Sequence, residues 1–133
     1  MKPQSVETSV SSVHLVDDNL LHWVYREGAV VTLREAEEEV AKVASLVTAN
    51  ALESTRLLID IRRIGSIDRT ASKLFSSDHI HDTYGVRALG LITGSRAGVV
   101  IGNFYMQVFG PKHPVRLFTG EDAARAWLGT FCE

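Results

Sequence analysis

The chain has 133 residues, a length that fits one compact domain with a hydrophobic core of its own. Hydrophobic residues make up 45% of the chain and charged residues 23%, which is ordinary for a soluble globular protein. The net charge is −2, so we exclude the strongly basic field that recruits nucleic acid or an anionic membrane.

The single cysteine, Cys132, stands next to the C-terminus, so we expect neither a disulfide framework nor a thiolate metal site. The first 30 residues show no signal-peptide pattern. No window of the sequence approaches the roughly 18 consecutive apolar residues that a membrane span needs. We therefore expect a soluble, cytoplasmic protein.

Residues 1–10 are rich in Ser, Thr, Lys and Glu, a composition typical of an unpacked chain end. We expect a flexible lead-in over residues 1–10 and a single domain over residues 11–133. Neither an internal repeat nor a low-complexity linker interrupts the longer range.

The segments SVHLV and NLLHWVYRE flank residues 17–19, Asp-Asp-Asn, and favour a β-hairpin. Asp and Asn side chains form local hydrogen bonds that suit a tight turn. The period of two places Leu21, Trp23 and Tyr25 on one face of the second strand. After Glu27-Gly28, the segment AVVT predicts a third short strand.

The next segment, TLREAEEEVAKVASLVTAN, has the period of a helix and opens on a capping box of Thr32 and Glu35. Apolar residues recur on one helical face: Ala36, Val40, Val43, Ala44 and Val47. The charged residues are expected mostly on the other faces: Glu35, Glu37, Glu38, Glu39 and Lys42.

The segment RLLIDI is apolar without alternation, which is typical of a parallel strand buried on both faces. Three helix candidates follow, DRTASKLFSS, SRAGVVIGNFYMQVF and GEDAARAWLGTF, separated by the strand candidates ALGLIT and VRLFT. The order is a β-meander and then alternating helices and strands. We therefore predict an α/β fold with a mixed sheet of five to six strands and right-handed crossovers.

The chain resembles the STAS family in three consecutive features. These are a strand that ends at Asp60, a short loop after it, and the residues SID before a helix. That family contains sulphate-transporter and anti-sigma-factor-antagonist domains, and the chain more closely resembles its small bacterial SpoIIAA-like stand-alone proteins. The order of elements agrees from about Ser12 to the C-terminus. The resemblance implies a SpoIIAA-like fold and a non-catalytic regulatory module that binds a protein partner.

In the anti-sigma-factor antagonists of this family, an Asp-Ser pair stands at the start of that helix, and a partner kinase phosphorylates the serine. Here Asp68 matches the aspartate, but Arg69 occupies the position of the phosphorylated serine. Ser66 and Thr70 are the neighbouring hydroxyls. The resemblance thus implies a partner-binding or switch site at Ser66, Asp68, Arg69 and Thr70, with a kinase or anti-sigma-type regulator as the partner. Because Arg69 stands where the family has a serine, the resemblance does not establish a phosphorylation switch in this chain.

The same stretch allows a purely structural interpretation. Asp68 has the chemistry and position of an N-cap, and the two hydroxyls can simply be solvated. A phosphate on Thr70 would instead lie in the first helical turn, near arginines, where negative charge is favourable. For Asp60, an ion pair with Arg62 or Arg63 is a better interpretation than a catalytic acid.

The segment SSDHIHDTYG groups two histidines, His79 and His81, with Asp78 and Asp82. It resembles a helix end running into a loop, where no third ligand is fixed, so we expect no metal site. The sequence contains no nucleophile elbow, Walker A motif or H-E-x-x-H motif. We therefore expect neither an enzyme nor a bound cofactor, although a small enzyme using Asp60 and a histidine remains a weaker alternative.

The third helix candidate is apolar all round and carries Gly98 and Gly102 as a small-xxx-small pair. Close packing on the sheet is the simplest explanation. The alternatives are a homodimer surface or a wall for an apolar ligand, formed by Val99, Gly102, Phe104 and Tyr105. Lipid-carrying relatives similar to the Sec14 domain share the architecture, so a carrier of an apolar small molecule that uses helix 96–109 is the alternative function.

Overall fold

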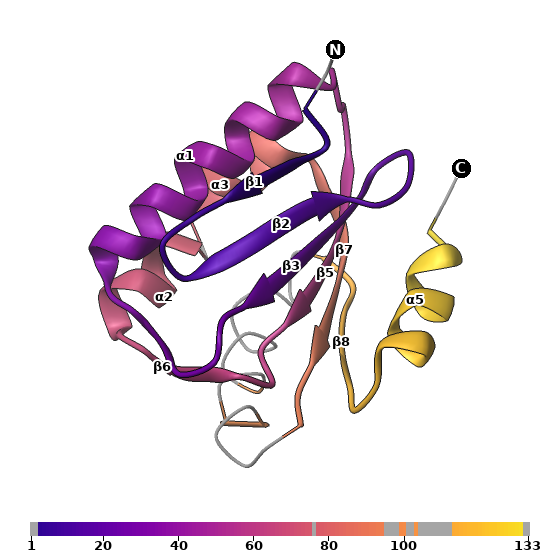
Figure 1. The fold of residues 1–133 in the computed structure, drawn as a ribbon. Helices are drawn as coiled ribbons and strands as arrows, with labels where there is room; N and C mark the ends of the chain where they lie inside the picture. The colour runs from indigo at the N-terminus through magenta and orange to yellow at the C-terminus, as the bar shows by residue number, and fades with distance from the viewer. Residues whose placement is uncertain (1–2, 76, 95–98, 101–102, 104–112, 132–133) are drawn as a thin grey trace.

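The computed structural model describes residues 3–75, 77–94, 99–100, 103 and 113–131 (Figure 1). Six strands form the larger sheet, in the order β1-β2-β3-β5-β7-β8. They are β1 (Ser5–Glu7), β2 (Ser11–Leu15), β3 (Leu20–Tyr25), β5 (Thr55–Asp60), β7 (Val86–Ile92) and β8 (Val115–Phe118). Strands β4 (Ala29–Val31) and β6 (Ile64–Ile67) form a second, two-stranded sheet.

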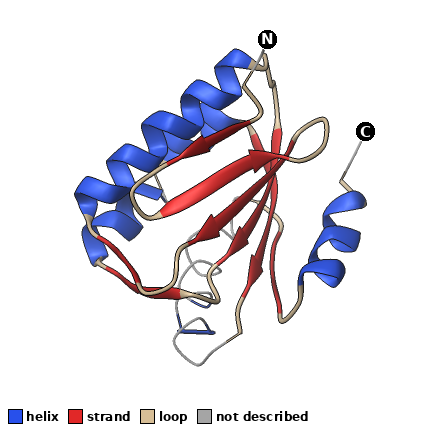
Figure 2. Cartoon of the chain, viewed as in Figure 1, coloured by secondary structure: helices blue, strands red, loops and turns tan. Residues whose placement is uncertain are grey.

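The helices are α1 (Leu33–Ala49), α2 (Arg69–Phe75), α3 (Asp78–Tyr84) and α5 (Glu121–Gly129). Helices α1, α2 and α3 lie on one side of the larger sheet and α5 on the other (Figures 1 and 2). Strands β1 to β3 are antiparallel, whereas β3, β5, β7 and β8 run parallel. The predicted mixed α/β class is thus confirmed. No described helix has the length and apolar character needed to cross a membrane.

Strand β5 is the centre of the sheet and is buried along all six residues. Leu57 and Ile59 join the large core beneath α1, α2 and α3, while Leu58 joins the smaller core beneath α5. Burial on both faces explains why this strand is apolar without alternation, and it confirms the interpretation of RLLIDI.

The predicted hairpin is β2–β3, and the face that Leu21, Trp23 and Tyr25 share is buried. The third predicted strand exists as β4, but it does not extend the meander. Gly28 adopts a positive φ of 73° and turns the chain out of the larger sheet, so β4 pairs in parallel with β6 instead. Strand β6, IGSI, is short and half polar, so no sequence pattern indicated it.

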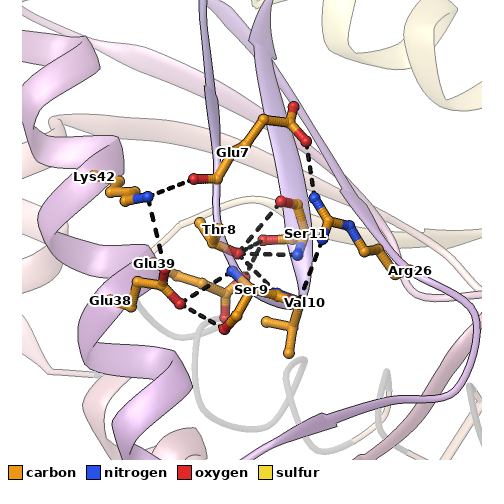
Figure 3. Close-up of polar contacts among 9 residues, drawn as sticks. All are labelled: Glu7, Thr8, Ser9, Val10, Ser11, Arg26, Glu38, Glu39 and Lys42. Carbon is orange, nitrogen blue, oxygen red and sulfur yellow. Dashed lines mark hydrogen bonds and ion pairs between the residues drawn. The ribbon is translucent and has the colours of Figure 1, made fainter.

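The N-terminal residues differ from the predicted lead-in, because Ser5–Glu7 pair with β2 as strand β1. Figure 3 shows how α1 holds this segment. The amide and hydroxyl of Ser9 donate to Glu38 Oε1 at 3.1 and 2.6 Å, and Lys42 Nζ donates to the carbonyl of Glu7 at 2.7 Å. The N-terminal segment whose polar composition suggested an unpacked chain end therefore forms hydrogen bonds with charged side chains of α1.

A helix boundary also differs from expectation. The predicted helix DRTASKLFSS is the shorter α2, and Asp78–Tyr84 form a separate helix, α3, where a helix end and a loop were expected. Tyr84 at the end of α3 donates its hydroxyl to the carbonyl of Val40 at 2.9 Å, which fastens α3 to α1.

Helix α1 begins with the predicted capping box of Thr32 and Glu35. Its core face contains Ala36, Val43 and Val47 as expected, but also Glu39, which is fully buried. Glu39 lies three residues after Ala36 and four before Val43, so helical spacing alone places it on the core face. The sequence prediction for Glu39 was wrong because the residue type was given more weight than its spacing.

The carboxylate of Glu39 joins α1 to the hairpin. Ser11 Oγ donates to Glu39 Oε2 at 2.7 Å and Trp23 Nε1 donates to the same oxygen at 2.8 Å, while the Tyr25 hydroxyl donates to Oε1 at 3.3 Å. Burial raises the pKa of Glu39 to about 7, because the three neutral donors offset only part of the desolvation.

This burial makes a prediction about stability and pH. The pKa of Glu39 is raised from 4.5 in the unfolded chain to about 7 in the fold, so the folded state binds the extra proton and loses stability as pH rises through that interval. The variant Glu39→Gln keeps the shape without the charge. We compare the free energy of unfolding of this variant with that of the native protein. The difference should shift in favour of the variant by about 2 to 3 kcal/mol between pH 5 and pH 8.

Urea denaturation at both pH values measures this difference. The exposed Glu37 on the same helix provides the matched control, because Glu37→Gln makes the same chemical change outside the core. A Glu39→Gln advantage that does not change with pH would contradict the account.

Candidate functional site

The predicted site lies at the corner where the two-stranded sheet meets the starts of α1 and α2 (Figure 1). The amide of Asp68 donates to the carbonyl of Val31 at 3.0 Å, and the amide of Gly28 donates to the carbonyl of Arg63 at 2.8 Å. These two bonds hold residues 63–68 at both ends against residues 28–31. We call residues 65–70 the tip.

Asp68 forms the expected N-cap of α2. Its Oδ1 accepts a hydrogen bond from the amide of Ala71 at 2.8 Å and another from the hydroxyl of Thr70 at 2.8 Å. The Ala71 amide, followed by the Thr70 hydroxyl, lowers the pKa of Asp68, and the backbone amide of Leu33 at the start of α1 adds to this effect. One carboxylate thus faces the starts of two helices, where free amides favour negative charge.

The tip is open to solvent, since Gly65, Ser66, Asp68, Arg69 and Thr70 are all exposed. The hydroxyl of Thr70 is already engaged by Asp68. Neither Ser66 nor Arg69 has a side-chain hydrogen bond or ion pair with the part of the chain that the structure describes. The structure therefore brings the four predicted residues together and leaves two of them free to contact another molecule.

Two apolar side chains beside the tip escaped the sequence analysis. Val30 is 57% exposed and Leu33 is 39% exposed. Val30 is the pairing partner of Ser66 in the β4–β6 sheet, so both side chains lie on its solvent face. The alternation in Ala29–Val31, where only the middle residue is exposed, could have indicated an outward-facing valine.

Asp60 forms the predicted ion pair with Arg62. Arg62 Nη2 lies 2.7 Å from Asp60 Oδ2, and Arg62 Nε lies 3.0 Å from Asp60 Oδ1. Burial alone would raise the pKa of Asp60, but the hydrogen bonds from Arg62 outweigh it and hold that pKa below its usual value. Both oxygens of the carboxylate are occupied, so this geometry suits a structural pair better than a proton acceptor.

His22 lies on the same side of the sheet as Asp60, because β3 pairs His22 with Leu58, two residues before Asp60 on β5. Its Nε2 lies 3.8 Å from Glu121 Oε1, and its Nδ1 lies 3.4 Å from Arg125 Nη2. Burial lowers the pKa of His22, and the nearby Glu121 offsets this only in part. Neutral His22 therefore sits between α5 and the sheet, next to the Glu121–Arg125 ion pair.

The remaining predicted positions contribute less. The backbone of Asp78–Tyr84 forms α3, but the side chains of His79 and His81 lie outside what the structure describes. Among the described residues, no three His, Cys, Asp or Glu side chains form a metal-binding group. Gly102, Phe104 and Tyr105 lie outside the described residues, whereas Val99 is described and is 43% exposed.

Solved structures with a similar fold support the predicted architecture. An uncharacterised protein of the DUF3478 family from Shewanella loihica PV-4, with a SpoIIAA-like fold, is 14% identical and has a TM-score of 0.64. The match covers 95% of this chain and 98% of that one. The anti-sigma factor antagonist SpoIIAA in its unphosphorylated form is 12% identical with a TM-score of 0.59, over 90% and 97% of the two chains.

At these identities the likeness concerns the fold, and it confirms the SpoIIAA-like architecture that the sequence predicted. No curated protein matches the sequence. The sequence profile of the domain of unknown function DUF7793 matches residues 14–132, which is most of the chain. The chain has a SpoIIAA-like fold and belongs to the DUF7793 family.

Proposed function

We propose that this protein is a non-enzymatic regulatory module that binds a protein partner through the tip, residues 65–70. The observation that carries the proposal is the arrangement around Asp68. The carboxylate and the amide of this residue are both used to fix the backbone, while Ser66 and Arg69 beside it are exposed and unengaged within the described structure. A rigid backbone that presents free side chains loses little conformational entropy on binding.

The likeness to an anti-sigma factor antagonist supports a protein as the partner. We propose a kinase or an anti-sigma-type regulator as the partner class, with the complex formed in the cytoplasm. A homodimer is the alternative assembly. The engagement of Asp60 by Arg62 supports a module that works by contact, since the best-placed acid of this sheet edge is already paired.

Ser66 is a better candidate than Thr70 for a modification point. The Thr70 hydroxyl donates to the capping Asp68, so a phosphate on Thr70 would remove this bond and place two negative groups side by side. Ser66 is exposed on β6 and has no such bond within the described structure. A phosphate there would add negative charge to the tip without displacing the cap.

Reversing the charge of Arg69 tests the proposed surface. Arg69 is exposed and makes no ion pair with described residues, so Arg69→Glu should leave the fold intact. We expect tagged Arg69→Glu protein to retain, from cells of the native host, less than about a tenth of the partner that the native protein retains. Affinity purification with quantitative mass spectrometry measures the retained partner, and thermal unfolding verifies the fold.

The matched control is Arg116→Glu, an equal charge change at an exposed residue of the edge strand β8. Arg116 lies 5.5 Å from the centre of the Phe118 ring, a contact of small energetic weight. Undiminished retention by Arg69→Glu, or an equal loss with Arg116→Glu, would count against the tip as the binding surface.

The close approach of Gly65 to β4 gives a second test. A Cβ atom at Gly65 would lie 2.8 Å from the backbone carbonyl oxygen of Gly28, so Gly65→Ala must displace the tip. We expect partner retention to fall, and the free energy of unfolding to fall by about 1 to 3 kcal/mol. Urea denaturation and the same purification measure both effects.

Gly129→Ala, at the end of α5, is the matched control, because a Cβ atom at Gly129 meets no atom within 4 Å. It should leave both partner retention and stability nearly unchanged. If Gly65→Ala behaved like this control, the tip would not depend on the backbone contact described here.

A further inference from the structure

We infer that the partner offers an acidic segment carrying an apolar side chain, and that this segment docks beside the tip. The inference rests on the proposed function and adds the chemistry of the partner. The surface that carries it comprises Val30, Leu33, Arg34, Arg63, Ser66 and Arg69, and we call these six residues the docking surface.

The apolar part of the docking surface is built into the junction of four elements. Val30 lies next to Ser66 across the β4–β6 pair, and Leu33 begins α1 with its amide facing the Asp68 carboxylate. With exposures of 57% and 39%, these side chains are two of the few large hydrophobic residues exposed in the part of the chain that the structure describes. A single exposed apolar residue is ordinary, but two of them bordering a rigid polar tip provide an anchor point for a partner side chain.

The charged part consists of three arginines spaced around this pair. Arg34 follows Leu33, Arg69 follows Asp68, and Arg63 precedes β6. All three are exposed, and none has a hydrogen bond or ion pair with the residues that the structure describes. Unpaired guanidinium groups are well suited to bidentate contacts with carboxylates.

The neighbouring carboxylates offset the charge of these arginines only in part. Hydrogen bonds from Thr32 lower the pKa of Glu35, and the charge of Arg34 adds to this effect. Glu35 accepts from the amide of Thr32 in the capping box, and Asp68 accepts from the amide of Ala71. Both therefore balance the positive ends of α1 and α2. Glu27 is exposed in the turn before β4, and its single negative charge is smaller than the summed positive charge of the three arginines. The surface thus complements a negatively charged segment.

A protein segment fits this surface better than an anionic membrane does. The chain as a whole carries a net charge of −2, which opposes adsorption to a negative bilayer. The docking surface also contains no aromatic residue, the type enriched at membrane interfaces. Two aliphatic side chains among arginines suit a short contact with one or two apolar side chains of a partner.

A random dodecapeptide phage library, selected against the immobilised full chain, tests the inference. Two variants serve for counter-selection: the double variant Arg63→Ser/Arg69→Ser and the single variant Val30→Ser. The ¹H–¹⁵N spectrum of each variant verifies its native fold. We expect the enriched peptides to place Asp or Glu on both sides of an aliphatic or aromatic residue. Synthetic copies should shift the amide signals of residues 30–34 and 63–70.

The affinity of these peptides, measured by fluorescence anisotropy, should fall at least about tenfold with Arg63→Ser/Arg69→Ser and several-fold with Val30→Ser. It should also weaken as salt rises from 50 to 300 mM. The variant Arg116→Ser, outside the docking surface, should bind the peptides like the native protein.

Three results would overturn the inference, and they separate it from the proposed function. Peptides without acidic bias that still map to residues 63–70 would end the acidic-partner inference and leave the tip as a binding surface. Peptides that map elsewhere, or no enrichment at all, would count against both. Tighter binding to vesicles of phosphatidylcholine with 30% phosphatidylserine, through the same residues, would replace the protein segment with a membrane.

Discussion

The arrangement of the corner that carries the proposed binding surface depends on Asp68. Its amide is bound to the carbonyl of Val31, and its carboxylate caps α2 while facing the first amide of α1. One residue therefore determines how β4, β6 and two helices meet. Without these contacts of Asp68, the exposed side chains around it would not be held in fixed positions relative to one another. They would then not form one continuous surface.

The frame behind this corner is fixed by burial. Strand β5 is enclosed on both faces, and α1 is tied to the hairpin by the buried Glu39 carboxylate with its three donors. A buried polar group accepts few alternative positions, because any shift leaves donors unpaired. We therefore interpret Glu39 as the contact that sets the position of α1 along the sheet, and with it the position of Leu33 beside the tip.

Local signals in the sequence were sufficient to predict the hairpin, α1, β5 and the Asp68 cap, because spacing or turn chemistry specifies each of them. Strands β1 and β6 could not be predicted, since each is short and polar and is held by residues far away in the chain. The alternation in Ala29–Val31 could indicate that Val30 points outward, but its place beside Ser66 depends on the same distant pairing and could not be predicted. Glu39 was the exception, because its spacing did indicate burial.

The most direct test of the central claim is site-specific photo-cross-linking in cells of the native host, with p-benzoylphenylalanine at position 66 of the full chain. Position 45, exposed on α1, is the comparison site. The account predicts a discrete protein adduct from position 66 that disappears when Arg69→Glu is also present, and no such adduct from position 45. Identical adducts from both positions, or none from position 66, would contradict it.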